Sequence, residues 1–175
     1  MDRTPVEIVA LLVSPVHAFE GRPQDGPRPE PPGVAREEVA VRAGLGLVGD
    51  RYFNHAAHRN AAVTVFDAAT LDVFGPLDPH RTRRNIAIRG YPVDDLAGGR
   101  NRIGAVFSLD SGAGPVRLQA FRPANPCAWM DVSVTPGAFR GLRGRGGIRC
   151  HPLDDGVLRL GAAILTVLEP PHTAE

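Results

Sequence analysis

The chain has 175 residues, of which 43% are hydrophobic, 22% charged and only 6% aromatic, and its net charge is +1. This length and composition are typical of one globular domain with an aliphatic core, so we expect residues 1–175 to form a single domain. The dispersed basic residues disfavour a nucleic-acid partner. All 20 basic residues are arginine, which excludes a Schiff-base lysine and the lysine of a P-loop.

The chain opens with an apolar run from Val6 to Val13, which is too short to span a bilayer and lacks a basic leader and a cleavage site. It is typical of a buried strand. The segment from Ser14 to Gly33 contains six prolines and almost no apolar residue after Phe19. We expect a long loop there, either a functional lid or a mobile excursion, and a disordered surface loop is the simpler interpretation.

Short apolar runs separated by Gly and Pro recur through the rest of the chain. They predict a mainly β fold, a closed or partly open β-barrel with a few short helices. Short helices are predicted at Asp67–Phe74, capped by Asp67, and at two segments that begin with proline, Pro126–Met130 and Pro136–Leu142. The further strand-like runs are Glu37–Arg42, Ala62–Phe66, Asn85–Arg89, Ile103–Leu109, Val116–Phe121, Gly147–Arg149, Val157–Leu160 and Ala163–Leu168.

Gly44, Gly46 and Gly49 match the G-x-G-x-x-G fingerprint of dinucleotide-binding proteins. That fingerprint requires a helix to begin within the glycines, but the residues that follow carry no apolar helical stripe. The glycines are therefore predicted to form a tight turn between strands. His55 and His58 have no acidic third ligand near them in sequence, and we expect them in a surface loop.

Two arginine clusters favour an anionic ligand when they are taken together. Arg83, Arg84 and Asn85 precede a predicted strand, where they are either a solvated strand edge or a cradle for a phosphate. The segment Arg143–Gly147 combines guanidinium groups with glycines that allow close approach of backbone N–H groups to a ligand.

Cys127 follows a predicted strand and two prolines, and Arg122 lies just before it. One interpretation is a small buried hydrophobe. The other is a thiol held toward a cleft, where arginines favour the thiolate that binds soft metals and attacks sulfur. Cys150 lies inside a strand-like run and is predicted to be a core residue. With two cysteines and no disulfide framework, the sequence predicts a cytoplasmic protein with no membrane partner.

In order and spacing, these features resemble the MOSC domain, the family named after the C-terminal domain of molybdenum cofactor sulfurase. The resemblance covers nearly the whole chain. Its elements are the strand ending at Ser14-Pro15, Gly46–Arg51, Arg84–Gly90, Asp95-Leu96 before Arg102–Gly104, Pro126-Cys127, Gly144–Gly147 and Gly156–Gly161.

The resemblance implies a β-barrel that binds the molybdenum cofactor, a molybdopterin, with Cys127 as metal ligand and catalytic residue. It also implies a set of cofactor contacts: Asp50, Arg51, Arg83, Arg84, Asn85, Arg122, Arg145, Gly146 and Gly147. Relatives of this kind reduce N-hydroxylated small molecules, and because two cysteines cannot hold an iron–sulfur cluster, such an enzyme needs a separate electron-donor protein.

Two alternatives remain open at this stage. In one, Cys127 bears a persulfide, receives sulfur from a donor protein and passes sulfur or cofactor to another enzyme. In the other, the chain is a binding module for an anion or a cofactor and Cys127 has no chemical role.

Overall fold

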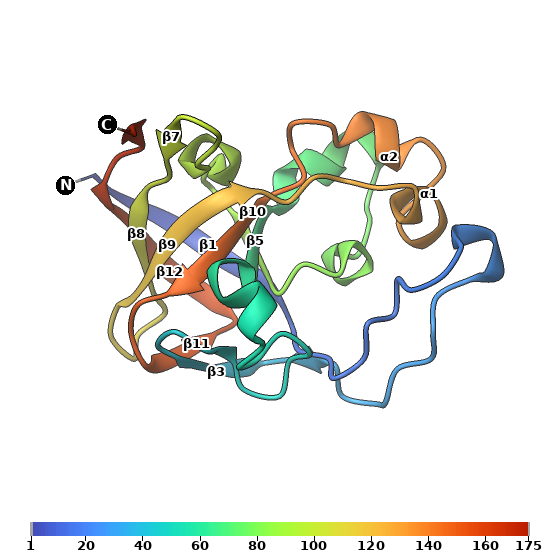
Figure 1. The fold of residues 1–175 in the computed structure, drawn as a ribbon, viewed down its shortest axis with the longest axis horizontal. Helices are drawn as coiled ribbons and strands as arrows, with labels where there is room; N and C mark the ends of the chain where they lie inside the picture. Colours follow the sequence, from blue (N-terminus) through green and yellow to red (C-terminus); the bar gives the residue numbers. More distant parts are fainter. Residues whose placement is uncertain (1, 175) are drawn as a thin grey trace.

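The computed structural model describes residues 2–174, and its centre is a closed β-barrel (Figure 1). The barrel strands are β1 (Arg3–Leu12), β5 (Val63–Asp67), β6 (Ile86–Arg89), β8 (Val106–Asp110), β9 (Val116–Pro123), β10 (Ile148–Pro152) and β12 (Gly161–Glu169). They are hydrogen-bonded in the order β12–β8–β9–β10–β5–β6–β1, and β12 pairs with β1 to close the barrel. Only the β5–β6 pair is parallel. The prediction of a mainly β barrel with a few short helices is confirmed.

Smaller elements surround the barrel. A three-stranded sheet has the order β11–β3–β4, a two-stranded ribbon joins β13 to β7, and β2 pairs with the edge of β1. These strands are β2 (Ala35–Arg36), β3 (Glu38–Arg42), β4 (Gly46–Leu47), β7 (Arg102–Ile103), β11 (Gly156–Arg159) and β13 (His172–Thr173). The helices are α1 (Trp129–Ser133), α2 (Ala138–Gly141) and five 3-10 helices, η1 (Pro23–Asp25), η2 (Ala56–Ala61), η3 (Ala68–Phe74), η4 (Pro79–Thr82) and η5 (Val93–Leu96).

Side chains that alternate along the strands form two separate apolar cores. On β5 and β6, Val65, Ile86 and Ile88 belong to the cluster enclosed by the barrel. Phe66 and Ala87, which lie between them in the period-two pattern of a strand, belong to a second cluster outside it. That second cluster also contains apolar residues of η3, α1 and α2, so it packs the helical segment 129–142 against the outer face of the barrel.

Local sequence signals located most of these elements correctly. The expected glycine turn is a hairpin, in which Val41 of β3 pairs with Leu47 of β4. Asp67 caps η3, since its carboxylate accepts a hydrogen bond from the backbone N–H of Ala69. The helix expected to begin at Pro126 begins instead at Trp129.

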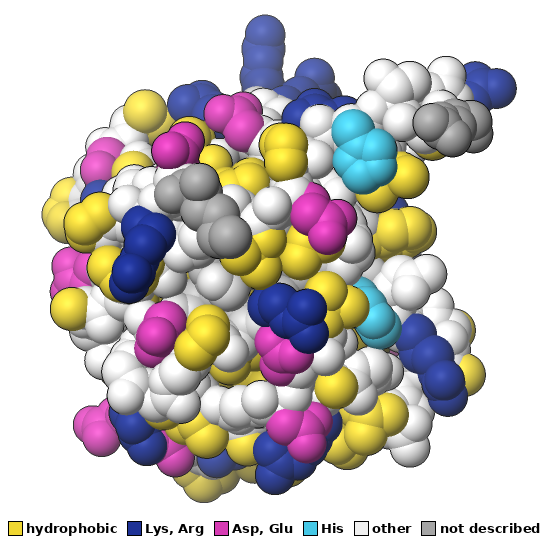
Figure 2. Space-filling view, turned by 90° about the vertical axis from the view of Figure 1, so that its left-hand side faces the viewer, with side chains coloured by type: hydrophobic (Ala, Val, Ile, Leu, Met, Phe, Trp, Pro, Cys, Tyr) yellow, Lys and Arg dark blue, Asp and Glu magenta, His cyan; other side chains and the backbone are white. Residues whose placement is uncertain are grey.

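The described surface shows no charge stripe on the face in Figure 2, where acidic and basic side chains are interspersed. Within residues 2–174, no helix combines the length and the apolar content that crossing a bilayer requires.

Candidate functional site

A pocket with a volume of about 200 Å³ lies between the barrel, the loop formed by residues 14–33 (the 14–33 loop) and α1. Four arginines line it, and no acidic residue is among the described residues that do so. A guanidinium-rich pocket without carboxylates is suited to an anionic ligand. The lining residues are His17, Phe19, Arg51, Tyr52, Thr64, Arg83, Arg84, Asn125, Cys127, Trp129, Met130 and Arg149.

Cys127 lies in the connection between β9 and α1, and it both lines the pocket and is exposed to solvent. The backbone N–H of Met130 donates to the Cys127 carbonyl at 2.9 Å, which forms a turn before the helix begins and fixes the position of the cysteine. Cys150 has no exposed surface, and burial raises the pKa of its thiol. Cys127 is therefore the accessible thiol of the two, and Cys150 is a core residue, as expected.

This difference predicts a clear result in thiol labelling. We expect a disulfide reagent such as DTNB to modify one thiol per folded chain rapidly and a second only after unfolding, because Cys150 is sealed inside the barrel. Cys127→Ala should have no rapidly reacting thiol under native conditions. Rapid modification of two thiols in the folded wild-type protein would contradict the assignment.

Arg84 is almost fully buried in the wall of the pocket. Its Nε donates to the carbonyl of Gly146 and its Nη2 to the carbonyl of Ala124, both at 2.8 Å. Burial, reinforced by the charge of Arg149, lowers the pKa of Arg84 to about 10, so the guanidinium remains charged at neutral pH. Arg84 thus ties the connection that carries Cys127 to the glycine segment and brings a positive charge to the pocket.

Arg83 also lines the pocket, but its guanidinium group holds the 14–33 loop. Nη2 donates to the carbonyl of Val16 at 3.1 Å, and Nη1 forms an ion pair with Glu30. Burial acts to raise the pKa of Glu30, but the hydrogen bonds from Arg83 and Ser14 and the charges of Arg83 and Arg51 together lower the pKa of that carboxyl. Arg83 itself adopts a left-handed backbone conformation, with φ of 59°. The residue therefore fixes the loop against the pocket, and its charge is balanced by Glu30.

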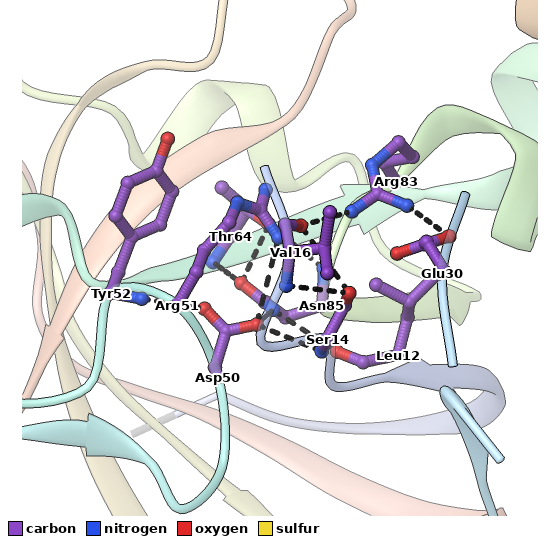
Figure 3. A network of polar contacts seen from close by, with 10 residues as sticks. All are labelled: Leu12, Ser14, Val16, Glu30, Asp50, Arg51, Tyr52, Thr64, Arg83 and Asn85. Atoms are coloured by element: carbon purple, nitrogen blue, oxygen red, sulfur yellow. Dashed lines mark hydrogen bonds and ion pairs between the residues drawn. The ribbon is translucent and has the colours of Figure 1, made fainter. Parts of the chain in front are cut away.

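Asp50 and Asn85 form a buried network behind the pocket instead of lining it (Figure 3). Asp50 accepts hydrogen bonds from the backbone N–H groups of Ser14 and Tyr52 and from the Asn85 amide. The Asn85 amide also donates to Leu12, and its carbonyl oxygen accepts from the backbone and hydroxyl of Thr64. Both amide hydrogens of Asn85 are thus already used, so none is free for a phosphate. The network joins β1, β5 and β6 to the first residues of the 14–33 loop.

Two donors of Arg51 form no hydrogen bond within residues 2–174, although one of them lies in an ion pair with Asp50. Its Nε and Nη1 are buried and form no hydrogen bond with the described residues, and Nη1 lies 3.7 Å from the Asp50 carboxylate, too far for a hydrogen bond. Its guanidinium lies 4.7 Å from the centroid of the Tyr52 ring. Buried donors are rarely left unpaired in proteins. Because Arg51 lines the pocket, its guanidinium adds positive charge to the pocket wall.

The remaining predicted contacts lie outside the pocket. Arg145 is exposed, and its Nη2 donates to the carbonyl of Gly141. A Cβ atom at Gly146 would overlap the carbonyl oxygen of Ala124, and one at Gly147 would overlap that of Val65. The close backbone approach that these glycines allow is therefore to the chain's own backbone. Arg122 is exposed at the end of β9.

No sequence pattern indicated that aromatic side chains line the pocket. Phe19, from the 14–33 loop, stacks on Trp129 at the start of α1, with ring centroids 5.1 Å apart and an interplanar angle of 5°. The rings of His17 and Tyr52 are nearly perpendicular, with their centroids 6.2 Å apart. Arg149 of β10 was also missed. These residues lie far apart in the chain, and no local pattern links them.

No protein-family model matches the chain, and no curated protein matches it. Solved structures do. The YuaD protein from Bacillus subtilis is 16% identical over 99% of both chains, with a TM-score of 0.63. YiiM from Geobacillus stearothermophilus is 18% identical over 97% of this chain and 75% of its own, with a TM-score of 0.55. A protein described as hypothetical is 14% identical over 96% of this chain and 69% of its own, with a TM-score of 0.51. At these identities the likeness shows the fold alone, and the fold is MOSC-like.

Proposed function

We propose that the pocket binds the molybdenum cofactor, with Cys127 as the protein ligand to the metal and with arginines as donors to the pterin phosphate. One observation carries the proposal: an exposed thiol shares a small pocket with Arg51 and Arg84, and no described carboxylate lines that pocket. Thiolates suit soft metals, and guanidinium groups suit phosphate.

The residues present fit this cofactor. Among the described residues no cluster of three His, Cys, Asp or Glu side chains can hold a metal ion, so a metal bound by the chain alone is disfavoured. The molybdenum cofactor supplies two sulfur ligands of its own and requires only one from the protein. Arg51 and Arg84 line the pocket and bring to it guanidinium groups of the kind that the cofactor's phosphate requires.

When bound, the cofactor supplies a redox-active metal to which a substrate oxygen can be transferred. On this proposal the substrate is a small N-hydroxylated compound, and its reduction to the amine consumes two electrons and two protons and releases water. The electrons come from a separate donor protein, since the two cysteines cannot form a cluster. Arg51 and Arg84 hold the phosphate end, and the stacked rings of Phe19 and Trp129 supply an apolar part of the pocket wall.

The direct test is the molybdenum and pterin content of the protein purified from a host that makes the cofactor. We expect both in near-stoichiometric amounts in the wild type, with most of both lost in Cys127→Ala. Cys150→Ala is the matched control, because it removes the same atom from a position enclosed in the barrel. Its cofactor content should equal that of the wild type. A wild-type protein without molybdenum, or a Cys127→Ala protein that keeps it, would refute the proposal.

A sulfur carrier is the second candidate, and the exposure of Cys127 favours it, because a donor protein can reach the sulfur. Persulfide formation is a reversible modification of such a thiol. Sulfane sulfur on Cys127, found without molybdenum in the same preparations, would support the carrier. If the folded protein contains neither molybdenum nor sulfane sulfur, both candidates fail and the chain is a binding module without chemistry at Cys127.

A further inference from the structure

Two arginines face each other across neighbouring strands at the edge of the pocket. In the register of β9 and β10, Arg122 is the direct partner of Arg149, and the regular pairing is interrupted immediately afterwards, between Arg149 and Cys150. Side chains of directly opposite residues in an antiparallel pair project from the same face of the sheet and lie close together. The two guanidinium groups are therefore neighbours.

This pair is electrostatically unfavourable in the protein alone. Like charges directly opposite each other destabilise a sheet, and no described side chain compensates either guanidinium by a hydrogen bond or an ion pair. Burial lowers the pKa of Arg149, and the charges of Arg122 and Arg51 lower it further. The nearby His58 experiences the same field, since burial and the charges of His55, Arg149 and Arg122 lower the pKa of its imidazole.

The pair also extends from the interior of the pocket to its rim. Arg149 is half-buried and lines the pocket, whereas Arg122 is exposed and does not. Cys127 lines the same pocket as Arg149 and Arg84. An anion held between Arg122 and Arg149 would therefore lie beside Cys127, nearer to solvent than Arg84.

We propose that Arg122 and Arg149 form a second anion site, which binds the carboxylate or phosphate group of the molecule that reacts at Cys127. On the proposed function, the cofactor phosphate is bound separately, by Arg51 and Arg84, which also line the pocket. The identification of the ligand as a substrate rests on the proposed function; the existence of the anion site does not. The substrate class is thereby narrowed to small anionic compounds.

The test uses protein purified from a cofactor-producing host and titrated with inorganic phosphate or acetate at low salt. We expect Arg122→Gln and Arg149→Gln each to weaken binding of the added anion about tenfold, because each removes a charge-assisted contact. Arg117→Gln is the matched control. Arg117 lies on the same strand as Arg122, but its guanidinium is already paired with Asp154 at 2.8 Å. That control should bind as the wild type does.

Cofactor content, measured in the same samples, separates the two sources of the anionic group. Unchanged molybdenum and pterin in Arg122→Gln and Arg149→Gln support a substrate site, whereas loss of both shows that the pair holds the cofactor phosphate and overturns the proposal. If the wild type contains no cofactor but the two variants still lose phosphate binding, the proposed function fails and the anion site stands.

Thermal stability distinguishes an anion-binding role of Arg122 from a purely structural role, because replacing a structurally important residue would not raise the melting temperature. Without added anion, Arg122→Gln should raise the melting temperature by about 1 to 3 °C, because it removes a repulsion between neighbouring strands. Added phosphate should then stabilise the wild type more than the variant. A variant that melts below the wild type and binds phosphate equally well would overturn the inference.

Discussion

Gly146→Ala is expected to reduce the free energy of unfolding by more than about 3 kcal/mol. The added Cβ would overlap the carbonyl oxygen of Ala124 and would also lie 3.0 Å from the Cδ atom of Pro126. Both neighbours belong to a connection that is fixed by Arg84 and by a 2.8 Å hydrogen bond from the Ala124 N–H to the Gly147 carbonyl. Because backbone must move to make room, the substitution should also displace Cys127.

Gly144→Ala is the matched control, two residues away in the same segment. Gly144 has φ of 74°, but no atom lies within 4 Å of an added Cβ atom. Its replacement should therefore cost only the strain of a left-handed alanine, about 1 kcal/mol. Urea unfolding of both variants measures the difference. Equal losses of stability would show that backbone strain, and not the contact with Ala124, determines the effect at Gly146.

The segment Arg143–Gly147 shows which structural features its composition could predict and which it could not. Its composition indicated close backbone approach, and at Gly146 and Gly147 the backbone lies close to the carbonyl groups of Ala124 and Val65. A glycine in the sequence indicates that some group can lie close to its Cα atom, but it does not identify that group. The same holds for Asn85, which was expected to face an anion. Its side chain instead bonds to Leu12 of β1, Thr64 of β5 and the Asp50 carboxylate.

The barrel itself was predictable because its signals are local. Alternating and β-branched apolar runs such as those of β5 and β9 predict strands wherever they occur, and glycine and proline mark their ends. The pairing of Ile103 with His172 has no such signal, since β13 is two residues long and the contact joins distant segments. Strand order and closure likewise come from long-range pairing.

Within the candidate site, single residues were predictable and their combinations were not. Cys127 and Arg84 stood out by residue type and position, and both line the pocket. Arg149 appeared to be the end of an ordinary strand-like run, and only the register that places it opposite Arg122 gives it significance. The stacking of Phe19 on Trp129 depends on how the 14–33 loop folds back, which proline content alone does not determine.

Asp50→Ala is expected to cost about 3 to 5 kcal/mol of unfolding free energy, the range for removing one partner of a buried charged network. The substitution leaves the N–H groups of Ser14 and Tyr52 and the Asn85 amide without their acceptor, and Arg51 without its nearest carboxylate. The first residues of the 14–33 loop would lose their attachment to the barrel. Asp155→Ala, which removes a single exposed bond from the Ala43 N–H, is the control and should cost less than about 1 kcal/mol.

The pH dependence of the stability lost in Asp50→Ala shows whether the effect comes from titration of the Asp50 carboxyl group or from the contacts that the side chain makes at any pH. Burial raises the pKa of Asp50 in the folded chain, although Arg51 and the three donors oppose the shift. A folded-state pKa above the unfolded one adds stability that is complete below the unfolded pKa and is lost as the pH rises through the folded value. The difference in unfolding free energy between wild type and Asp50→Ala should therefore be larger at pH 4 than at pH 7. Urea unfolding at the two pH values measures it, and a smaller difference at pH 4 would mean that the Asp50 carboxylate is stabilised, not penalised, where it lies.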